Sequence, residues 1–87
     1  WDDTKCKTNL KKHRLDFADA EIVFEGLTLT IPDNRFDYGE DRFISFGMLD
    51  NAIVIIAHTE RGDETRIISM RKASKHEEII YFKSLGN

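Results

Sequence analysis

The stretch "RFISFGMLDNAIVIIAHTERGDETRIISMRKA", residues 42–73, decides the fold of this 87-residue chain. It contains three strand-like runs, "RFISFGML", "AIVIIAHT" and "ETRIISMR", which are separated by "DN" and "ERGD". Both separators are rich in residues that favour the tight turns of hairpins. The middle run is apolar on both faces, so both faces of the sheet should be covered. These features predict an antiparallel meander at the centre of the protein.

Elements on both sides of the meander extend this prediction. "LTLTIPD" at 27–33 alternates apolar residues with threonine, which is the period of a half-buried strand, and Pro32 ends it. "SKHEEIIYFKSL" at 74–85 places Glu77 three residues after Ser74, the spacing of a helix capping box. The apolar residues expected on the inner side of this C-terminal helix are Ile79, Phe82 and Leu85.

Two N-terminal helices are predicted before the sheet. In "WDDTKCKTNLKKH", Asp3 or Thr4 can cap a helix, and in "LDFADAEIVFEG" Asp16 can cap a second one. The second helix should end near Gly26 in a left-handed conformation. The expected apolar stripes are Cys6, Leu10 and His13 on the first helix, and Phe17, Ala20, Val23, Phe24 and Leu27 on the second. The order helix, helix, four strands, helix predicts a single α+β domain over residues 1–87.

Composition limits the class of protein. A chain this short buries a small core, so its stability should depend on a partner. The single cysteine cannot form an internal disulfide, which favours a reducing compartment such as the cytoplasm. The longest apolar run, "AIVIIA" at 52–57, is too short for a membrane span of about 20 residues, so no membrane partner is expected. Because the chain begins with Trp1 instead of Met, residues that include a further strand can precede it.

Charge is segregated along the chain despite a net charge of only -3. Residues 1–14 carry five Lys or Arg against two Asp, whereas residues 15–41 carry eight Asp or Glu against one Arg. Residues 42–72 are slightly basic. Such segments are usually solvated faces, but they can also define separate binding surfaces.

The basic residues of the meander suggest a phosphate site. Alternation along a strand predicts that Arg66 and Arg71 point to opposite faces, with Lys72 beside Arg71 at the strand end. Arg42, at the start of the first long strand, should come close to Arg71. Guanidinium groups present fixed pairs of donors that suit phosphate, and His58 would lie nearby.

Each candidate also has a structural interpretation. A histidine at a strand end, such as His58, is often a satisfied structural residue, and Arg61 in its turn is expected to be solvated. His13 can be a core-facing residue as easily as an RNA contact. Glu40 and Glu77 can be cap or ion-pair residues. The residues alone therefore predict a phosphate-binding α+β module and no specific reaction.

A family resemblance adds to this reading. Three blocks occur in order along the chain: "WDDTKCKTNLKKHRLDFADA" with Asn9, Lys12, His13, Phe17 and Ala20, "YGEDR" at 38–42, and "HTERGDETRIISMRKASKHE" followed by Tyr81. In these blocks the chain closely resembles the BrnT toxins of type II toxin-antitoxin systems. The resemblance implies a RelE-like fold, RNA cleavage that halts translation, and neutralisation by a BrnA-type antitoxin. It also implies that operator DNA is bound only through the antitoxin. The chain departs from the family at Arg14, where Gly is usual after "KH", and at Met70, where a small residue is usual.

An RNA-cleaving enzyme is therefore the first functional hypothesis. Cleavage without a metal ion needs a base for the 2′-hydroxyl, cations for the phosphate and an acid for the leaving oxygen. No cofactor or metal ion is expected. The catalytic candidates are Arg71, Arg66, His58 and Glu40, and the RNA-binding candidates are Arg42, Lys72, Lys12 and His13.

Two alternatives remain. The first is a non-catalytic interaction module, or a decayed toxin, that only binds its antitoxin. The second is a nucleic-acid binder without chemistry, which the acidic net charge disfavours.

Overall fold

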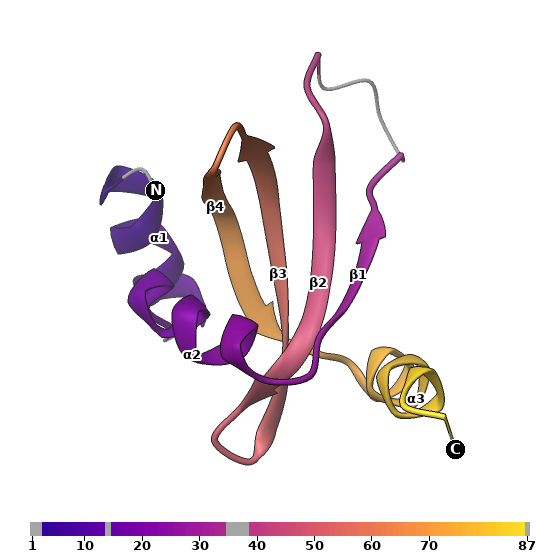
Figure 1. The fold of residues 1–87 in the computed structure, drawn as a ribbon. Helices are drawn as coiled ribbons and strands as arrows, with labels where there is room; N and C mark the ends of the chain where they lie inside the picture. Colours follow the sequence, from indigo (N-terminus) through magenta and orange to yellow (C-terminus); the bar gives the residue numbers. More distant parts are fainter. Residues whose placement is uncertain (1–2, 14, 35–38, 87) are drawn as a thin grey trace.

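The computed structural model describes residues 3–13, 15–34 and 39–86, without the side chains of 11–13. Its four strands form one antiparallel sheet in the order β1-β2-β3-β4 (Figure 1). The strands are β1 (Leu29–Pro32), β2 (Arg42–Leu49), β3 (Ala52–Arg61) and β4 (Glu64–Lys72). The helices are α1 (Asp3–His13), the 3-10 helix η1 (Phe17–Asp19), α2 (Ala20–Glu25) and α3 (Lys75–Ser84). The predicted α+β class, the antiparallel meander and the C-terminal helix are confirmed.

Both predicted hairpins are present. Asp50 has a φ of 55° in the turn between β2 and β3, and Gly62 has a φ of 61° in the turn between β3 and β4. Left-handed conformations of this kind suit Asp, Asn and Gly, which is why "DN" and "ERGD" turn the chain here.

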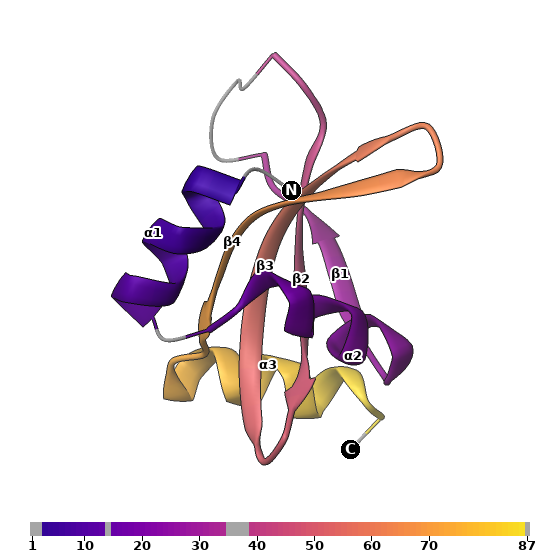
Figure 2. The same cartoon turned by 90° about the vertical axis from the view of Figure 1, so that its left-hand side faces the viewer.

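The sheet has a covered core on each face, as the apolar β3 run predicts. Helices α1 and α2 cover one face, and α3 crosses the strands on the other face (Figures 1 and 2). The core beneath α1 and α2 contains Leu15, Phe17, Ala20, Val23, Leu49, Val54, Ile56, Ile67 and Met70. The core beneath α3 contains Phe46, Ile53, Ile55 and Tyr81. The part of the α3 face where β2 starts and β3 ends is not covered by any helix of the described chain.

Asn9 fastens α1 to the edge strand β4. Its side-chain amide donates to the carbonyl oxygen of Leu15 at 3.1 Å, and its Oδ1 accepts from the backbone N–H of Met70 at 3.0 Å. Asn9 is buried, whereas Leu10 is 45% exposed, so the prediction that Leu10 faces the core was wrong. The reason is that the backbone N–H of an edge strand needs an acceptor, and Asn9 supplies one.

The second N-terminal segment differs from the prediction. It divides into η1 and α2, and the Asp16 side chain accepts from the backbone N–H of Ala18 at 3.0 Å. Gly26 ends α2 in an extended conformation, with φ −92° and ψ −165°, and not in the predicted left-handed one. The chain therefore leaves the helix straight toward β1. This leaves Leu27 outside the helical stripe and 71% exposed.

Helix α3 begins with the predicted capping box, in which Ser74 and Glu77 each bond the other's backbone N–H. The prediction for its inner side was wrong, because Ile79 and Phe82 are 52% and 47% exposed. Tyr81 is the buried residue of α3, and its hydroxyl donates to the carbonyl oxygen of Leu27 at 2.8 Å. The helix therefore meets the sheet through one aromatic side chain that also fills a backbone acceptor.

A β-bulge changes the facing of the β4 arginines. His58 pairs with Ile67, whereas Ala57 pairs with Ser69, so β4 carries one extra residue at this point. An extra residue shifts the alternation of side chains beyond it. Arg66 lies opposite Thr59 and Arg71 lies opposite Ile55, and both therefore share the α3 face. The prediction that they point to opposite faces was wrong.

Among the described residues, none of the helices has the length and apolar character needed to cross a lipid bilayer.

Candidate functional site: an arginine cluster on the open sheet face

The candidate site is a row of three residues across neighbouring strands. Arg42 of β2 pairs with Thr59 of β3, and Thr59 pairs with Arg66 of β4. Directly paired residues lie on the same face of a sheet, with strands about 4.8 Å apart. Two long cationic side chains thus flank one hydroxyl on the uncovered part of the α3 face. We call these three residues the arginine row.

Glu40 and Arg61 extend the arginine row toward the end of the sheet. Arg61 donates to Oε2 of Glu40 at 3.1 Å, and Arg42 lies 3.7 Å from Oε1 of Glu40. The hydrogen bond from Arg61 lowers the pKa of Glu40, and the charges of Arg42 and Arg66 lower it further. Glu40 is therefore an ionised carboxylate surrounded by three guanidinium groups at neutral pH.

Arg66 and Thr59, unlike Arg42, make no ion pair with Glu40. Within the described ranges, the side chain of Arg66 makes no hydrogen bond, so its guanidinium is available to a ligand. Thr59 is 2% exposed, and its Oγ1 has no hydrogen-bond partner in the described chain. A buried hydroxyl without a hydrogen-bond partner costs roughly 1–3 kcal/mol.

Arg71 lies apart from this cluster. Its position opposite Ile55 is four residues along β3 from Thr59, or about 13 Å at about 3.3 Å per residue. Its two terminal nitrogens donate to the two oxygens of Glu77 at 2.7 and 2.8 Å. This bidentate pair joins β4 to α3, and the hydrogen bonds from Arg71 are the main reason that the pKa of Glu77 falls to about 2.

The predicted grouping of Arg71 with Lys72 and Arg42 was therefore wrong. Lys72 lies opposite Val54, whose side chain belongs to the core under α1 and α2, so Lys72 is on the other face. Arg42 lies in the row with Arg66 instead. The side chains of Lys12 and His13, and all of Arg14, lie outside the described residues.

His58 lies on the opposite face from the arginine row and is 2% exposed. Its ring stacks on Phe43 with centroids 5.9 Å apart and meets the edge of Phe24 at 5.3 Å. Burial lowers the pKa of His58 below its ordinary value of 6.5, although nearby Glu60 opposes this effect. The imidazole is thus a neutral group within the core, away from the arginines.

A chain of polar contacts, buried at Ser45 and His58, runs from β1 to β3. Nε2 of His58 lies 2.7 Å from Oγ of Ser45, which lies 2.7 Å from Oγ1 of Thr30, and Nδ1 of His58 lies 2.9 Å from Oε1 of Glu60. A serine, a histidine and a carboxylate in this order have the connectivity of a nucleophile triad. Ser45 is completely buried, however, so no substrate can reach its oxygen. These contacts link polar side chains of β1, β2 and β3.

Sequence reasoning missed two members of the cluster. Arg61 was interpreted as a solvated turn residue, and it is 58% exposed, but it also bonds Glu40. Thr59 was not among the predicted site residues. The signal for both was hairpin register, because pairing Arg42 with Thr59 brings Arg61 level with Glu40. In the described part of the chain, no group of three or more His, Cys, Asp or Glu side chains could hold a metal ion.

The fold and the site define a small α+β protein whose open sheet face carries clustered arginines, which suits a phosphate-bearing ligand. The model of a known family, described as the ribonuclease toxin BrnT of type II toxin-antitoxin systems, matches residues 1–77. The chain belongs to this family, and the resemblance seen in its sequence is confirmed. No curated protein matches the chain.

Proposed function

We propose that this chain is the toxin of a type II toxin-antitoxin pair and that it cleaves RNA at the arginine row without a metal ion. The observation that carries the proposal is the row itself: Arg42, Thr59 and Arg66 share the uncovered part of the α3 face. Membership of the family gives the class of reaction. The geometry suggests which residues perform it.

Arg66 and Arg42 grip the phosphate in this proposal. Their guanidinium groups approach from both sides of Thr59 and can donate paired hydrogen bonds to the phosphate oxygens. Thr59 lies buried between the two arginines and sets the spacing of their strands. Fixed donors aimed at the charge that develops on the phosphate lower the barrier to cleavage, and the same cations stabilise the departing 5′-oxygen in place of a dedicated acid until water protonates it.

Glu40 is the base that this geometry favours. It lies beside the arginines, whereas His58 is buried on the other face between Phe24 and Phe43. The lowered pKa of Glu40 makes it a weak base at neutral pH, so it depends on the arginines to acidify the 2′-hydroxyl that it deprotonates. We assign His58 to the core and Arg71 to the attachment of α3.

The wider assignments are part of the same proposal. The fold is proposed to be RelE-like and to act in the cytoplasm, where RNA cleavage halts translation. A BrnA-type antitoxin neutralises it by placing acidic or apolar residues on the arginine row, and it alone contacts operator DNA. A tight partner of this kind raises the apparent stability of the folded chain by mass action.

The test is induction of the chain in cells with and without the product of its neighbouring gene. Growth arrest and fragmentation of RNA are expected for the chain alone, and both should disappear when the two proteins are co-expressed. A chain that leaves RNA intact but binds the neighbouring product would instead identify a non-catalytic interaction module.

A further inference from the structure

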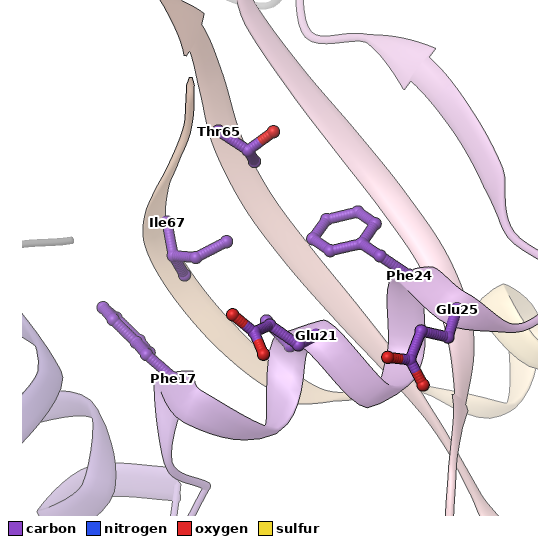
Figure 3. Close-up of a pocket in the computed structure, with 7 residues that line it drawn as sticks. Phe17, Glu21, Phe24, Glu25, Thr65 and Ile67 are labelled. Carbon is purple, nitrogen blue, oxygen red and sulfur yellow. The ribbon is translucent and has the colours of Figure 1, made fainter. Parts of the chain in front are cut away.

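A groove on the other face of the sheet has no role in the proposed reaction. It lies between the η1–α2 segment and β4 and has a volume of about 480 Å³ (Figure 3). Phe17, Glu21, Phe24 and Glu25 line it from the helical side, and Thr65 and Ile67 line it from β4. We call it the α2 groove.

The α2 groove combines an apolar floor with an acidic rim. Phe17, Phe24 and Ile67 supply the floor, and Glu21 and Glu25 stand one helical turn apart on α2. A third carboxylate lies beside it, because the hydroxyl of Thr65 donates to Glu60 at 2.8 Å. Within the described residues, no Lys or Arg lines the groove.

The α2 groove and the arginine row lie on opposite faces of β4. Thr65 pairs with Glu60 and Ile67 pairs with His58, on the face that α1 and α2 cover, whereas Arg66 pairs with Thr59 on the α3 face. The two sites therefore differ in charge and in position. RNA is repelled by the carboxylates of the groove, so its occupant must come from another class of molecule.

We infer that the α2 groove docks a segment of the partner protein in which an apolar side chain is flanked by Lys or Arg. The apolar side chain enters the floor, and the flanking cations pair with Glu21 and Glu25. Charge complementarity supports this occupant, because the groove is formed largely by the acidic segment 15–41. The inference rests on the proposed function for the existence of that partner. This second contact would hold the partner protein without covering the arginine row.

The direct test is an NMR titration of the isotope-labelled chain with two blocked synthetic peptides. One peptide alternates lysine with leucine, and its counterpart alternates glutamate with leucine. The basic peptide should shift the amide resonances of Glu21, Thr65 and Ile67 in a saturable way, while the acidic peptide should not. Equal shifts with both peptides, or shifts confined to other regions, would overturn the inference.

Charge reversal provides a matched pair of variants. Glu21→Lys should weaken binding of the basic peptide by at least about fivefold, because it replaces an attractive pair with a repulsive one. Asp63→Lys makes the same change of charge in the exposed β3–β4 turn and should leave binding unchanged. If Glu21→Lys binds the peptide as tightly as the wild type, the inference is wrong.

Filling the groove provides a second pair. Thr65 is exposed, so Thr65→Trp should fold and place its ring in the groove, which blocks the basic peptide. Thr65→Val removes the hydroxyl without filling the space and should still bind. Unimpaired binding by Thr65→Trp would contradict the inference.

RNA cleavage measured on the same samples separates this inference from the proposed function. Wild type, Glu21→Lys and Thr65→Trp should cleave RNA at equal rates, because the groove is on the other face from the arginine row. If Glu21→Lys alone lost RNA cleavage, the α2 groove would contribute to cleavage. The claim that the groove and the arginine row act separately would then be wrong. If the wild-type chain binds the basic peptide but cleaves no RNA, the proposed function is wrong and the inference about the α2 groove is supported.

Discussion

Replacing Glu77 by glutamine tests how α3 is attached to the sheet. Glu77 accepts two hydrogen bonds from Arg71, and these are the largest cause of the fall of its pKa from 4.5 to about 2. A fall of the pKa from 4.5 to about 2 corresponds to about 3.5 kcal/mol at about 1.4 kcal/mol per unit. The Arg71 side chain is 43% exposed, so screening by solvent reduces the contribution to about 1–2 kcal/mol. Glu77→Gln should lower the free energy of unfolding by that amount at pH 7.

The direction of the pKa shift of Glu77 predicts how its stabilising effect changes with pH. The folded-state pKa of Glu77 lies below its unfolded value, so the stabilisation is fully present above about pH 4.5 and is lost as the pH falls toward 2. Urea denaturation followed by circular dichroism at pH values from 7 to 3 measures it. The difference between wild type and Glu77→Gln should be constant down to about pH 5 and shrink below that. Glu78→Gln, in the same helical turn, is the control. A difference that is absent at pH 7, or that does not shrink in acid, would refute the reasoning.

Two other substitutions test the packing of the α1 and α2 face, both by urea denaturation at pH 7. Asn9→Ala should cost about 2–4 kcal/mol, because it removes two buried hydrogen bonds and leaves the N–H of Met70 without an acceptor; a loss under about 1 kcal/mol would contradict this. Gly47→Ala should cost about 1–3 kcal/mol, because its new Cβ would lie 2.5 Å from Cγ1 of Val23. Gly26→Ala, whose Cβ would come no nearer than 3.7 Å to a neighbour, is its control.

Elements with a local signature could be predicted from the sequence. The two-residue period of the strands, the turn residues and the Ser74–Glu77 capping box each depend on a few adjacent positions. Features that depend on distant parts of the chain could not be predicted from the sequence. Tyr81 faces the sheet because a carbonyl oxygen at Leu27 needs a donor, and no pattern within α3 reveals that acceptor.

Arg42, Arg66 and Glu40 of the candidate site were among the predicted residues, but their arrangement was not predicted. Nothing in the run from Ile67 to Ser69 marks a bulge, yet that one extra residue brings Arg66 and Arg71 to the same face. Arg71 was expected to grip phosphate because sequence cannot show that Glu77 already holds both of its terminal nitrogens. His58 was a candidate base for the same reason, since its burial depends on aromatic side chains from two other elements.

The most direct test of the arginine row is the rate of RNA cleavage by purified, folded variants in single-turnover conditions. Arg66→Ala and Arg42→Ala should each cleave about 100-fold or more slowly than the wild type, because each removes a fixed cation from the phosphate. Lys83→Ala, on the exposed surface of α3, should cleave at the wild-type rate. Circular dichroism spectra and urea midpoints of all three variants should first be compared with those of the wild type to check that each variant is folded. Wild-type rates for both folded arginine variants would contradict the assignment of RNA cleavage to this face of the sheet.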